Sequence, residues 1–167
     1  MLRMTAKDRD PELLRADAFE RFYRSEQPGQ IRRAILLLGS EADANDAVAH
    51  AFSNIYERWG HLDEPGAYLN RSVLNSCRDI ARRRSRVTVA DVEIDVANEH
   101  DIDQSRMVMK AVLELPYKQR AVVVLRHYAG LNEAEIADQL GIAQGSVGPT
   151  LFRAQAKLKK TLKEFAR

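Results

Sequence analysis

Residues 131–162 of the chain read LNEAEIADQLGIAQGSVGPTLFRAQAKLKKTL, which predicts two helices joined by a tight turn. Ile136 and Leu140 stand one turn apart on the apolar side of the first helix, and Gly141 follows where helices commonly end in a left-handed conformation. The second helix has an apolar stripe formed by Val147, Leu151, Ala154, Leu158 and Leu162. Its other side is basic, with Arg153, Lys157, Lys159, Lys160 and Lys163. Two helices across a short glycine-containing turn form a helix-turn-helix unit, whose second helix enters the major groove of DNA.

An ordinary helical hairpin with a solvated basic face fits the same pattern, so the charge of the whole chain matters. Residues 1–90 hold 15 basic and 13 acidic side chains. Residues 91–103 hold six acidic and no basic ones, and residues 104–167 hold 11 basic and five acidic ones. A hydrophobic content of 45% is globular. The basic end is the part that a polyanion attracts, and the acidic connector suggests separate partners for separate parts.

Several classes of protein are disfavoured by the residues that carry chemistry. Cys77 is the single cysteine, so no intramolecular disulfide is possible, and a buried, inert thiol is expected. The four histidines have no close ligand spacing, and no nucleophile–base pair, phosphate loop or metal motif stands out. We therefore expect no catalytic residues, no metal and no cofactor. The longest apolar runs are too short to cross a bilayer and no amino-terminal signal is present, which predicts a cytoplasmic protein.

The first half of the chain is helical by periodicity. Residues 1–12 are polar and are expected to form a flexible leader. A helical pattern over 13–38 is interrupted by Pro28-Gly29, which predicts two helices or one bent helix. The next helix is expected over 43–59, with Asp43 as its cap, and another follows the loop 60–66.

The stretch VTVADVEIDVANEHDID, residues 87–103, is acidic and poor in helix signals. It is predicted to be a linker between domains, although its Val/Ile alternation also fits a short strand. A second helical set follows over 104–167. The sequence thus predicts an all-α protein with two small helical domains, 13–86 and 104–167, the second containing the helix-turn-helix unit.

Motifs in both halves resemble one known family. The second half carries Leu115-Pro116, Arg120, Val122, Leu125-Arg126, Gly130-Leu131, Glu135-Ile136-Ala137, Leu140-Gly141-Ile142, Gly145, Val147, Leu151 and Arg153-Ala154. The first half carries Asp43-Ala44, Asp46, Val48, Phe52, Tyr68-Leu69, Arg71, Asn75, Asp79 and Arg82-Arg83. In this order, with an acidic linker between, the chain resembles an extracytoplasmic-function sigma factor, the small promoter-specificity subunit of bacterial RNA polymerase. The resemblance implies a protein that directs core RNA polymerase to promoters and assists promoter melting.

The resemblance implies that the helix 43–59 binds core polymerase. Asp43, Asp46, Val48 and Phe52 are the matching residues. An exposed Phe52 would anchor this interface, and the alternative is that Phe52 belongs to the core. The chain has Ala49-His50 where the family usually has Gln-Glu, which places the polar part of this contact in question.

The resemblance also implies that the same domain opens the minus-ten DNA element. The matching residues are His61, Tyr68, Arg71, Asn75, Arg82 and Arg83. Rings, a guanidinium and an amide can hold extruded bases and offset the few kcal/mol per base that unstacking costs. The arginines at the end of this run would hold the phosphate backbone, or they are a solvated helix end whose cations suit the helix dipole.

The fourth region of the family reads the minus-thirty-five element. Gly148 and Pro149 depart from the basic or polar residues that relatives commonly carry there, as do Thr150 and Phe152. A recognition helix that begins near residues 146–149 tolerates the proline. The remaining candidates for DNA contact are Ser146, Thr150, Arg153 and Lys157, and weaker or unusual recognition is expected.

The implied partners are core RNA polymerase, promoter DNA and, as for many members of the family, an anti-sigma factor. The acidic linker would suit basic polymerase channels, or it is only a tether. Two other functions compete with this interpretation: a stand-alone helix-turn-helix regulator, which needs a dimer surface for paired half-sites, and a helical adaptor that does not bind DNA.

Overall fold

The computed structural model describes residues 10–84 and 99–165, and every regular element in these ranges is helical. The elements are α1 (Pro11–Leu38), α2 (Glu41–Arg58), α3 (Pro65–Arg84), α4 (Glu99–Leu113), α5 (Tyr117–His127), α6 (Glu133–Leu140), the 3-10 turn η2 (Gln144–Ser146) and α7 (Val147–Phe165). The predicted all-α class is confirmed. Because α4 begins at Glu99, the helix includes residues that the sequence placed in the linker, and residues 87–98 lie outside the described residues, as does most of the expected leader.

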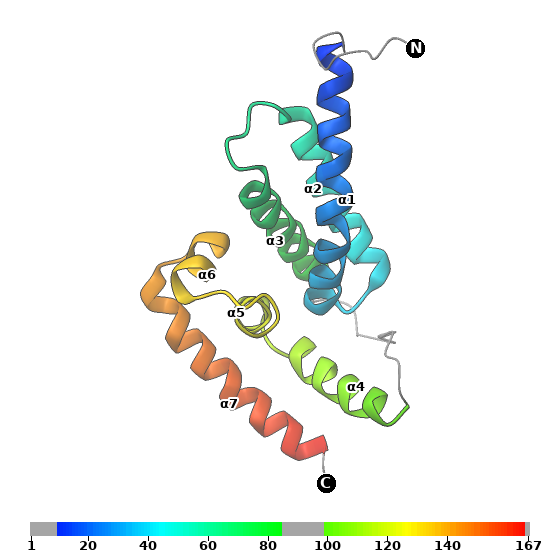
Figure 1. Cartoon of the computed structure of the whole chain (residues 1–167). Coiled ribbons are helices and arrows are strands. Elements are labelled where there is room, and N and C mark those ends of the chain that lie inside the picture. Colours follow the sequence, from blue (N-terminus) through cyan, green and yellow to red (C-terminus); the bar gives the residue numbers. More distant parts are fainter. Residues whose placement is uncertain (1–9, 85–98, 166–167) are drawn as a thin grey trace.

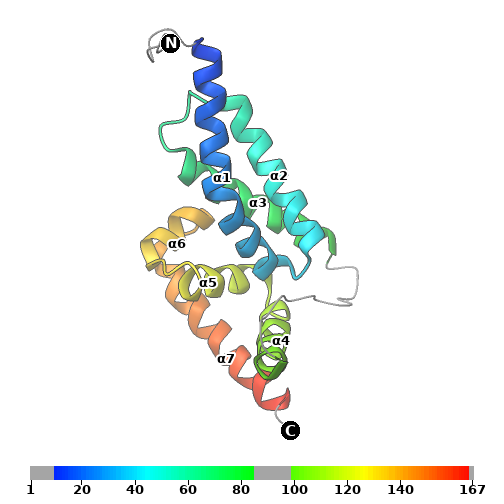
Figure 2. The same ribbon diagram turned by 45° about the vertical axis from the view of Figure 1, so that its right-hand side comes forward.

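The helices form two sets that pack against each other. The amino-terminal set, α1–α3, and the carboxy-terminal set, α4–α7, meet where α5 and α6 lie against α1 and α3 (Figure 1). Seen from a second direction, α4 and α7 extend away from this junction, so the start of α1 and the end of α7 lie at opposite ends of the molecule (Figure 2). The junction is therefore made by α5 and α6, with further contacts between α4 and α1.

The helix α1 runs through Pro28 without ending, so of the two predicted alternatives the structure excludes two helices and has a single one. A proline inside a helix removes one hydrogen bond and costs about 3 kcal/mol. Contacts on the carboxyl side of the proline offset this cost. Gln30 is buried and donates to Asn70 Oδ1 at 2.7 Å, and Arg33 donates to the same oxygen at 2.9 Å. These bonds fasten the second half of α1 to α3.

The start of α2 differs from the expected cap. Ser40, not Asp43, is the N-cap, and its hydroxyl accepts the backbone N–H of Asp43 at 3.2 Å. A serine in extended backbone conformation satisfies a free N–H of the first turn in this way. The Asp43 carboxylate instead pairs with Arg84 Nε at 2.6 Å. The side chain of Asp43 therefore links the start of α2 to the end of α3.

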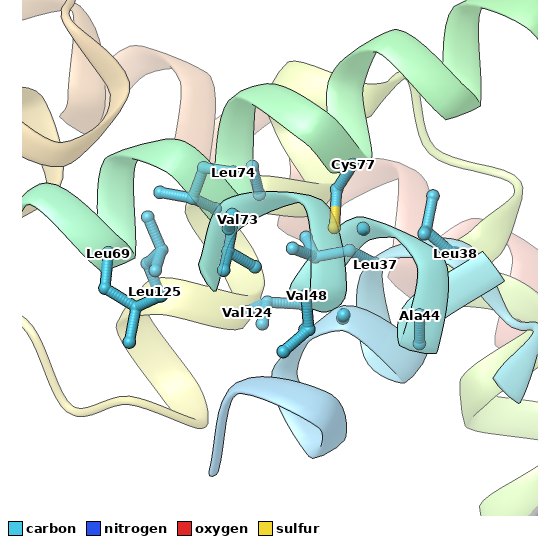
Figure 3. Packing of buried hydrophobic residues seen from close by; sticks show 14 of the residues in the cluster. Leu37, Leu38, Ala44, Val48, Leu69, Val73, Leu74, Cys77, Val124 and Leu125 are labelled. Atoms are coloured by element: carbon cyan, nitrogen blue, oxygen red, sulfur yellow. The ribbon is translucent and has the colours of Figure 1, made fainter. Parts of the chain in front are cut away.

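One apolar cluster runs through both helical sets. Figure 3 shows buried side chains of α1, α2 and α3 in one cluster with Val124 and Leu125 of α5. Leu37, Leu69 and Leu125 are each fully buried. Cys77 lies inside this cluster, and burial raises the pKa of its thiol to about 12, which keeps it protonated and inert near neutral pH, as expected. The two sets therefore share one core in this arrangement.

An aromatic cluster packs between the first half of α1 and the end of α2. Phe52 is 3% exposed and meets the ring of Tyr23 at 4.6 Å between centroids, while Phe19 packs edge-on to Tyr56 at 4.9 Å and to Trp59 at 5.2 Å. Of the two alternatives for Phe52, the structure therefore has the core residue and not the exposed anchor, because the ring fills the space between α1 and α2.

Arg120 of α5 is the charged group that holds the junction. Its Nη1 donates to the carbonyl of Leu37 at the end of α1, and its Nη2 donates to the carbonyls of Leu113 at 2.7 Å and Leu115 at 2.9 Å. Carbonyls in the last turn of a helix have no partner within the helix. Burial lowers the pKa of Arg120, yet the group remains charged because arginine titrates far above neutral pH.

We expect Arg120→Met to lower the free energy of unfolding by about 2–4 kcal/mol, because three carbonyl groups lose a charged donor while the aliphatic volume is kept. Urea unfolding of the full chain measures this loss. Arg126→Met is the matched control, since Arg126 is exposed and its described hydrogen bond is to a single carbonyl, that of Leu131. Equal losses in the two variants would contradict a special role for Arg120.

The burial of Phe52 gives a second expectation. Phe52→Ala leaves a cavity between α1 and α2 and is expected to cost about 3–5 kcal/mol of stability. Tyr56→Ala removes a ring that is 59% exposed and is expected to cost about 1 kcal/mol or less. Thermal and urea unfolding compare the two, and a small loss for Phe52→Ala would show that this ring is not part of the core.

Candidate nucleic-acid interface

The predicted helix-turn-helix unit is present as α6, η2 and α7. Asn132 caps α6 through a reciprocal pair of bonds with Glu135, at 2.9 and 2.8 Å. Gly141 ends the helix in the predicted left-handed conformation, with φ of 63°. The helix α7 begins at Val147, which puts Pro149 in its first turn, where no intrahelical donor is lost. The expectation of a recognition helix that begins near residues 146–149 is confirmed.

One side of α7 is buried and the other is free. Val147, Thr150 and Ala154 are buried against the rest of the carboxy-terminal set. Thr150 is only 4% exposed, and its hydroxyl donates to the carbonyl of Ser146 at 2.6 Å. The prediction that Thr150 contacts DNA does not fit this position. Ser146 in turn donates its hydroxyl to Ala143 O at 2.7 Å, so this side chain closes the turn before α7.

Of the other predicted contacts in this helix, Arg153 and Lys157 are exposed. Arg153 Nε donates to the carbonyl of Pro149 at 3.2 Å, and Lys157 Nζ lies 3.5 Å from the carbonyl of Glu114. The sequence analysis did not select Phe152 as a contact, although it is 74% exposed on the same helix. The signal in the sequence was its place in the helix: a residue two positions from Ala154 of the apolar stripe points away from the core.

A second candidate surface lies on α3. Tyr68, Arg71, Asn75 and Arg82 recur every three to seven residues and so share one side of this helix. The guanidinium of Arg58 lies over the ring of Tyr68, 5.6 Å from its centre. His61 is exposed in the loop between α2 and α3, and its backbone N–H donates to the carbonyl of Arg58 at 3.0 Å.

The predicted basic cluster is present at the end of α3. Arg82, Arg83 and Arg84 are exposed in its last turn, and Arg84 pairs with Asp43.

The carboxy-terminal set covers part of this α3 surface. Arg71 Nη2 makes two bonds of 2.7 Å to the carboxylate of Asp138 on α6, and this hydrogen bond and charge raise the pKa of Arg71. Tyr117 of α5 donates its hydroxyl to the carbonyl of Leu74 at 2.8 Å, and burial raises its pKa. A cavity of about 250 Å³ lies at this junction and is lined by Leu74, Asn75, Arg78, Arg82, Tyr117, Lys118, Gln139, Leu140 and Ile142. Arg71 and Asn75 thus face the second helical set in this arrangement.

Some of the α2 residues that were predicted to bind polymerase are buried or paired within the fold, and others are exposed. Val48 is 1% exposed and lies in the core with Phe52, and Asp43 is paired with Arg84. Asp46 is exposed, as are Ala49 and His50, the two residues that depart from the family pattern. The sequence missed Tyr56, which is 59% exposed at the end of the same helix. The free surface of α2 therefore consists of polar residues, alanines and one tyrosine.

Two observations bear on other kinds of site. Among the residues that the structure describes, no three His, Cys, Asp or Glu side chains lie together as a metal site would need. Within the same ranges, no helix is both long and apolar enough to span a membrane.

The second helical set matches a known family model. Residues 105–158 match the model for Sigma-70, region 4. The fold resembles two solved structures. The sigma factor RpoE from Bartonella quintana, in complex with the anti-sigma factor NepR, superposes with a TM-score of 0.73 at 22% identity, over 87% of this chain and 97% of that one. CnrH, in complex with the cytosolic domain of CnrY, gives a TM-score of 0.67 at 24% identity, over 89% and 90%.

Curated relatives match over nearly the whole chain. The RNA polymerase sigma-E factor of Streptomyces coelicolor is 33% identical over 152 residues, which cover 86% of this chain and 85% of that protein. The ECF RNA polymerase sigma factor SigM of Mycobacterium tuberculosis is 32% identical over 166 residues, covering 92% and 84%. A match over 92% of the chain includes residues of both helical sets. The chain belongs to the family of extracytoplasmic-function RNA polymerase sigma factors.

Proposed function

We propose that this chain directs core RNA polymerase to specific promoters and assists their melting, with one surface for each task. The observation that supports this most strongly is the presence of two separate candidate DNA surfaces, on α3 and α7, in a chain whose relatives are named RNA polymerase sigma factors. A stand-alone helix-turn-helix regulator needs only the second surface.

The exposed part of α2 is the proposed contact for core polymerase. Asp46 and His50 lie one turn apart on its free side, and Tyr56 follows near its end. Tyrosine is common at the centre of protein interfaces because it buries a large ring and keeps a hydrogen-bonding group. Val48 and Phe52 support this surface from inside rather than contact the partner.

The α3 surface is the proposed site for the minus-ten element. Tyr68 offers a ring for stacking, and Arg71 and Asn75 offer hydrogen bonds to extruded bases, with His61 at the preceding loop. Stacking on aromatic groups contributes about 1–3 kcal/mol per base, enough to offset much of the cost of unstacking. Arg82 and Arg83 would hold the phosphate backbone.

The helix α7 is the proposed site for the minus-thirty-five element. Its first turns enter the major groove, and Arg153 offers a guanidinium near that end. Lys157, Lys159 and Lys160 are exposed further along the helix, where they suit phosphates. The buried Thr150 is left out of this contact, and Ser146 supports the turn that precedes the helix.

In this proposal the chain supplies binding and no catalytic group, since the chemistry of RNA synthesis belongs to the polymerase. The site of action is the cytoplasm, where the polymerase and promoter DNA are found. An anti-sigma factor is a further proposed partner, supported by the two solved structural neighbours, both of which were determined as complexes with such proteins or their domains.

The packed arrangement of the two helical sets is too small to reach both promoter elements at once. Elements centred near positions −35 and −10 lie about 25 base pairs apart, or roughly 85 Å along the duplex. A compact body of this chain length has a radius of gyration of about 15 Å. Promoter binding therefore requires the sets to separate, which breaks the Arg71–Asp138 pair and exposes the face of α3.

The purified chain is expected to form a stable complex with core RNA polymerase that starts transcripts at chosen promoters. Within that complex, Arg153→Ala is expected to lower promoter affinity about tenfold or more through loss of a base or phosphate contact, and to leave core binding unchanged. Gel-filtration binding and run-off transcription measure the two effects. Arg126→Ala, an exposed arginine on α5, is the matched control. Failure to bind core polymerase would overturn the proposed function.

Separation of the helical sets is open to direct measurement. Spectroscopic labels on α1 and α7, introduced as Ser25→Cys and Glu164→Cys in a Cys77→Ala background, are expected to move apart when core polymerase and promoter DNA are added. Both label positions are exposed, so the labels should not disturb the core. A distance that stays the same in the promoter complex would contradict the opening of the junction.

A further inference from the structure

The exposed side of α7 changes character along its length. Its first three turns present Pro149, Phe152 and Ala156, positions that recur every three or four residues on the side opposite the buried Val147 and Ala154. None of these three side chains can donate or accept a hydrogen bond. Beyond them, the same side presents Lys159, Lys160 and Lys163. The free face of this helix is therefore apolar near its start and basic near its end.

Phe152 stands out on this face. At 74%, it is the most exposed of the large apolar side chains among the described residues. Its ring gains little from burial in the fold, because most of it remains in water. Arg153 lies next to it on one side, and lysines follow within two turns. A surface of this kind fits a partner that is negatively charged around a local apolar feature.

The major groove of DNA has that combination. Its walls are phosphates, and the one apolar group on its floor is the 5-methyl group of thymine. In a helix-turn-helix unit the first residues of the second helix meet the base edges, while positions further along meet the backbone. The order of residues on α7, apolar first and basic later, follows this division.

We propose that Phe152 specifies thymine in the minus-thirty-five element by packing its ring against thymine methyl groups. This inference rests on the proposed function and says how the α7 surface selects a DNA sequence. Arg153 is the flanking donor for a neighbouring base or phosphate, and the lysines hold the backbone.

The test uses a change of one methyl group. Randomised duplexes are selected with the complex of the full chain and core RNA polymerase, and an enriched sequence is remade with deoxyuridine in place of thymidine within the upstream element. The replacement removes only the methyl groups. The wild-type complex is expected to bind the uracil form about three- to fivefold more weakly for each methyl that Phe152 covers, as burial of one such group predicts. The same replacement outside the element should have no effect.

Three variants separate the proposed contact from general DNA affinity. Phe152→Ala should bind the thymine and uracil forms equally, and Phe152→Leu, which keeps an apolar side chain, should retain a preference for thymine. Lys160→Ala should weaken binding to both forms alike and reduce the dependence on salt. Phe152 is exposed, so these variants should fold normally.

The outcomes distinguish this inference from the function on which it rests. If the wild-type complex binds promoters but does not distinguish thymine from uracil, the assignment of Phe152 is wrong and the proposed function stands. If the preference survives in Phe152→Ala, another residue reads the methyl groups and the assignment is again wrong. If no complex with core polymerase forms, both the function and this inference fail.

Discussion

The guanidinium of Arg120 determines how the two helical sets meet. It is partly buried between them and donates to the carbonyl of Leu37 at the end of α1, to that of Leu113 at the end of α4 and to that of Leu115 just beyond it. Carbonyls at a helix end need donors from elsewhere, and a guanidinium withdrawn from water needs acceptors. The two Nη groups of Arg120 meet both needs, while its Nε is buried without a hydrogen-bond partner. The directions of α1, α4 and α5 are set there, and the shared apolar core forms around it.

The junction has a consequence for DNA binding. Arg71 and Asn75 lie on the side of α3 that the carboxy-terminal set approaches, and Arg71 is bonded to Asp138. The same residues are the proposed contacts for melted DNA, so the packed form and the promoter-bound form compete for one surface. An exposed ion pair such as Arg71–Asp138 contributes little stability in water, and salt weakens it further. The apolar contacts of the junction are not weakened by salt in this way. We infer that a partner with a large interface, such as the polymerase, is needed to open it.

Neighbouring residues of one motif serve different purposes in α2 and α7. Val48 and Phe52 fill the core, and Tyr56 at the same helix is exposed. Thr150 is buried and bonded to the preceding turn, and Phe152, two residues later, is free. A family motif contains both buried and exposed residues, because residues that hold the surface in place are needed as much as those that contact the partner. Burial separates them: the buried members keep the helix in position, and the exposed ones are available for recognition.

Local patterns in the sequence determined the helices, the all-α class, the left-handed Gly141 and the late start of α7 before Pro149, because each depends on residues within a few positions of one another. At Pro28 the same patterns left open two helices or one bent helix, and the single helix that forms is fastened to Asn70 on α3. Only the tertiary structure decided that Phe52 is buried, that Phe152 is free and that Arg71 meets Asp138. Those outcomes depend on which helices pack together, and helical periodicity alone does not specify the partner of an apolar or charged face.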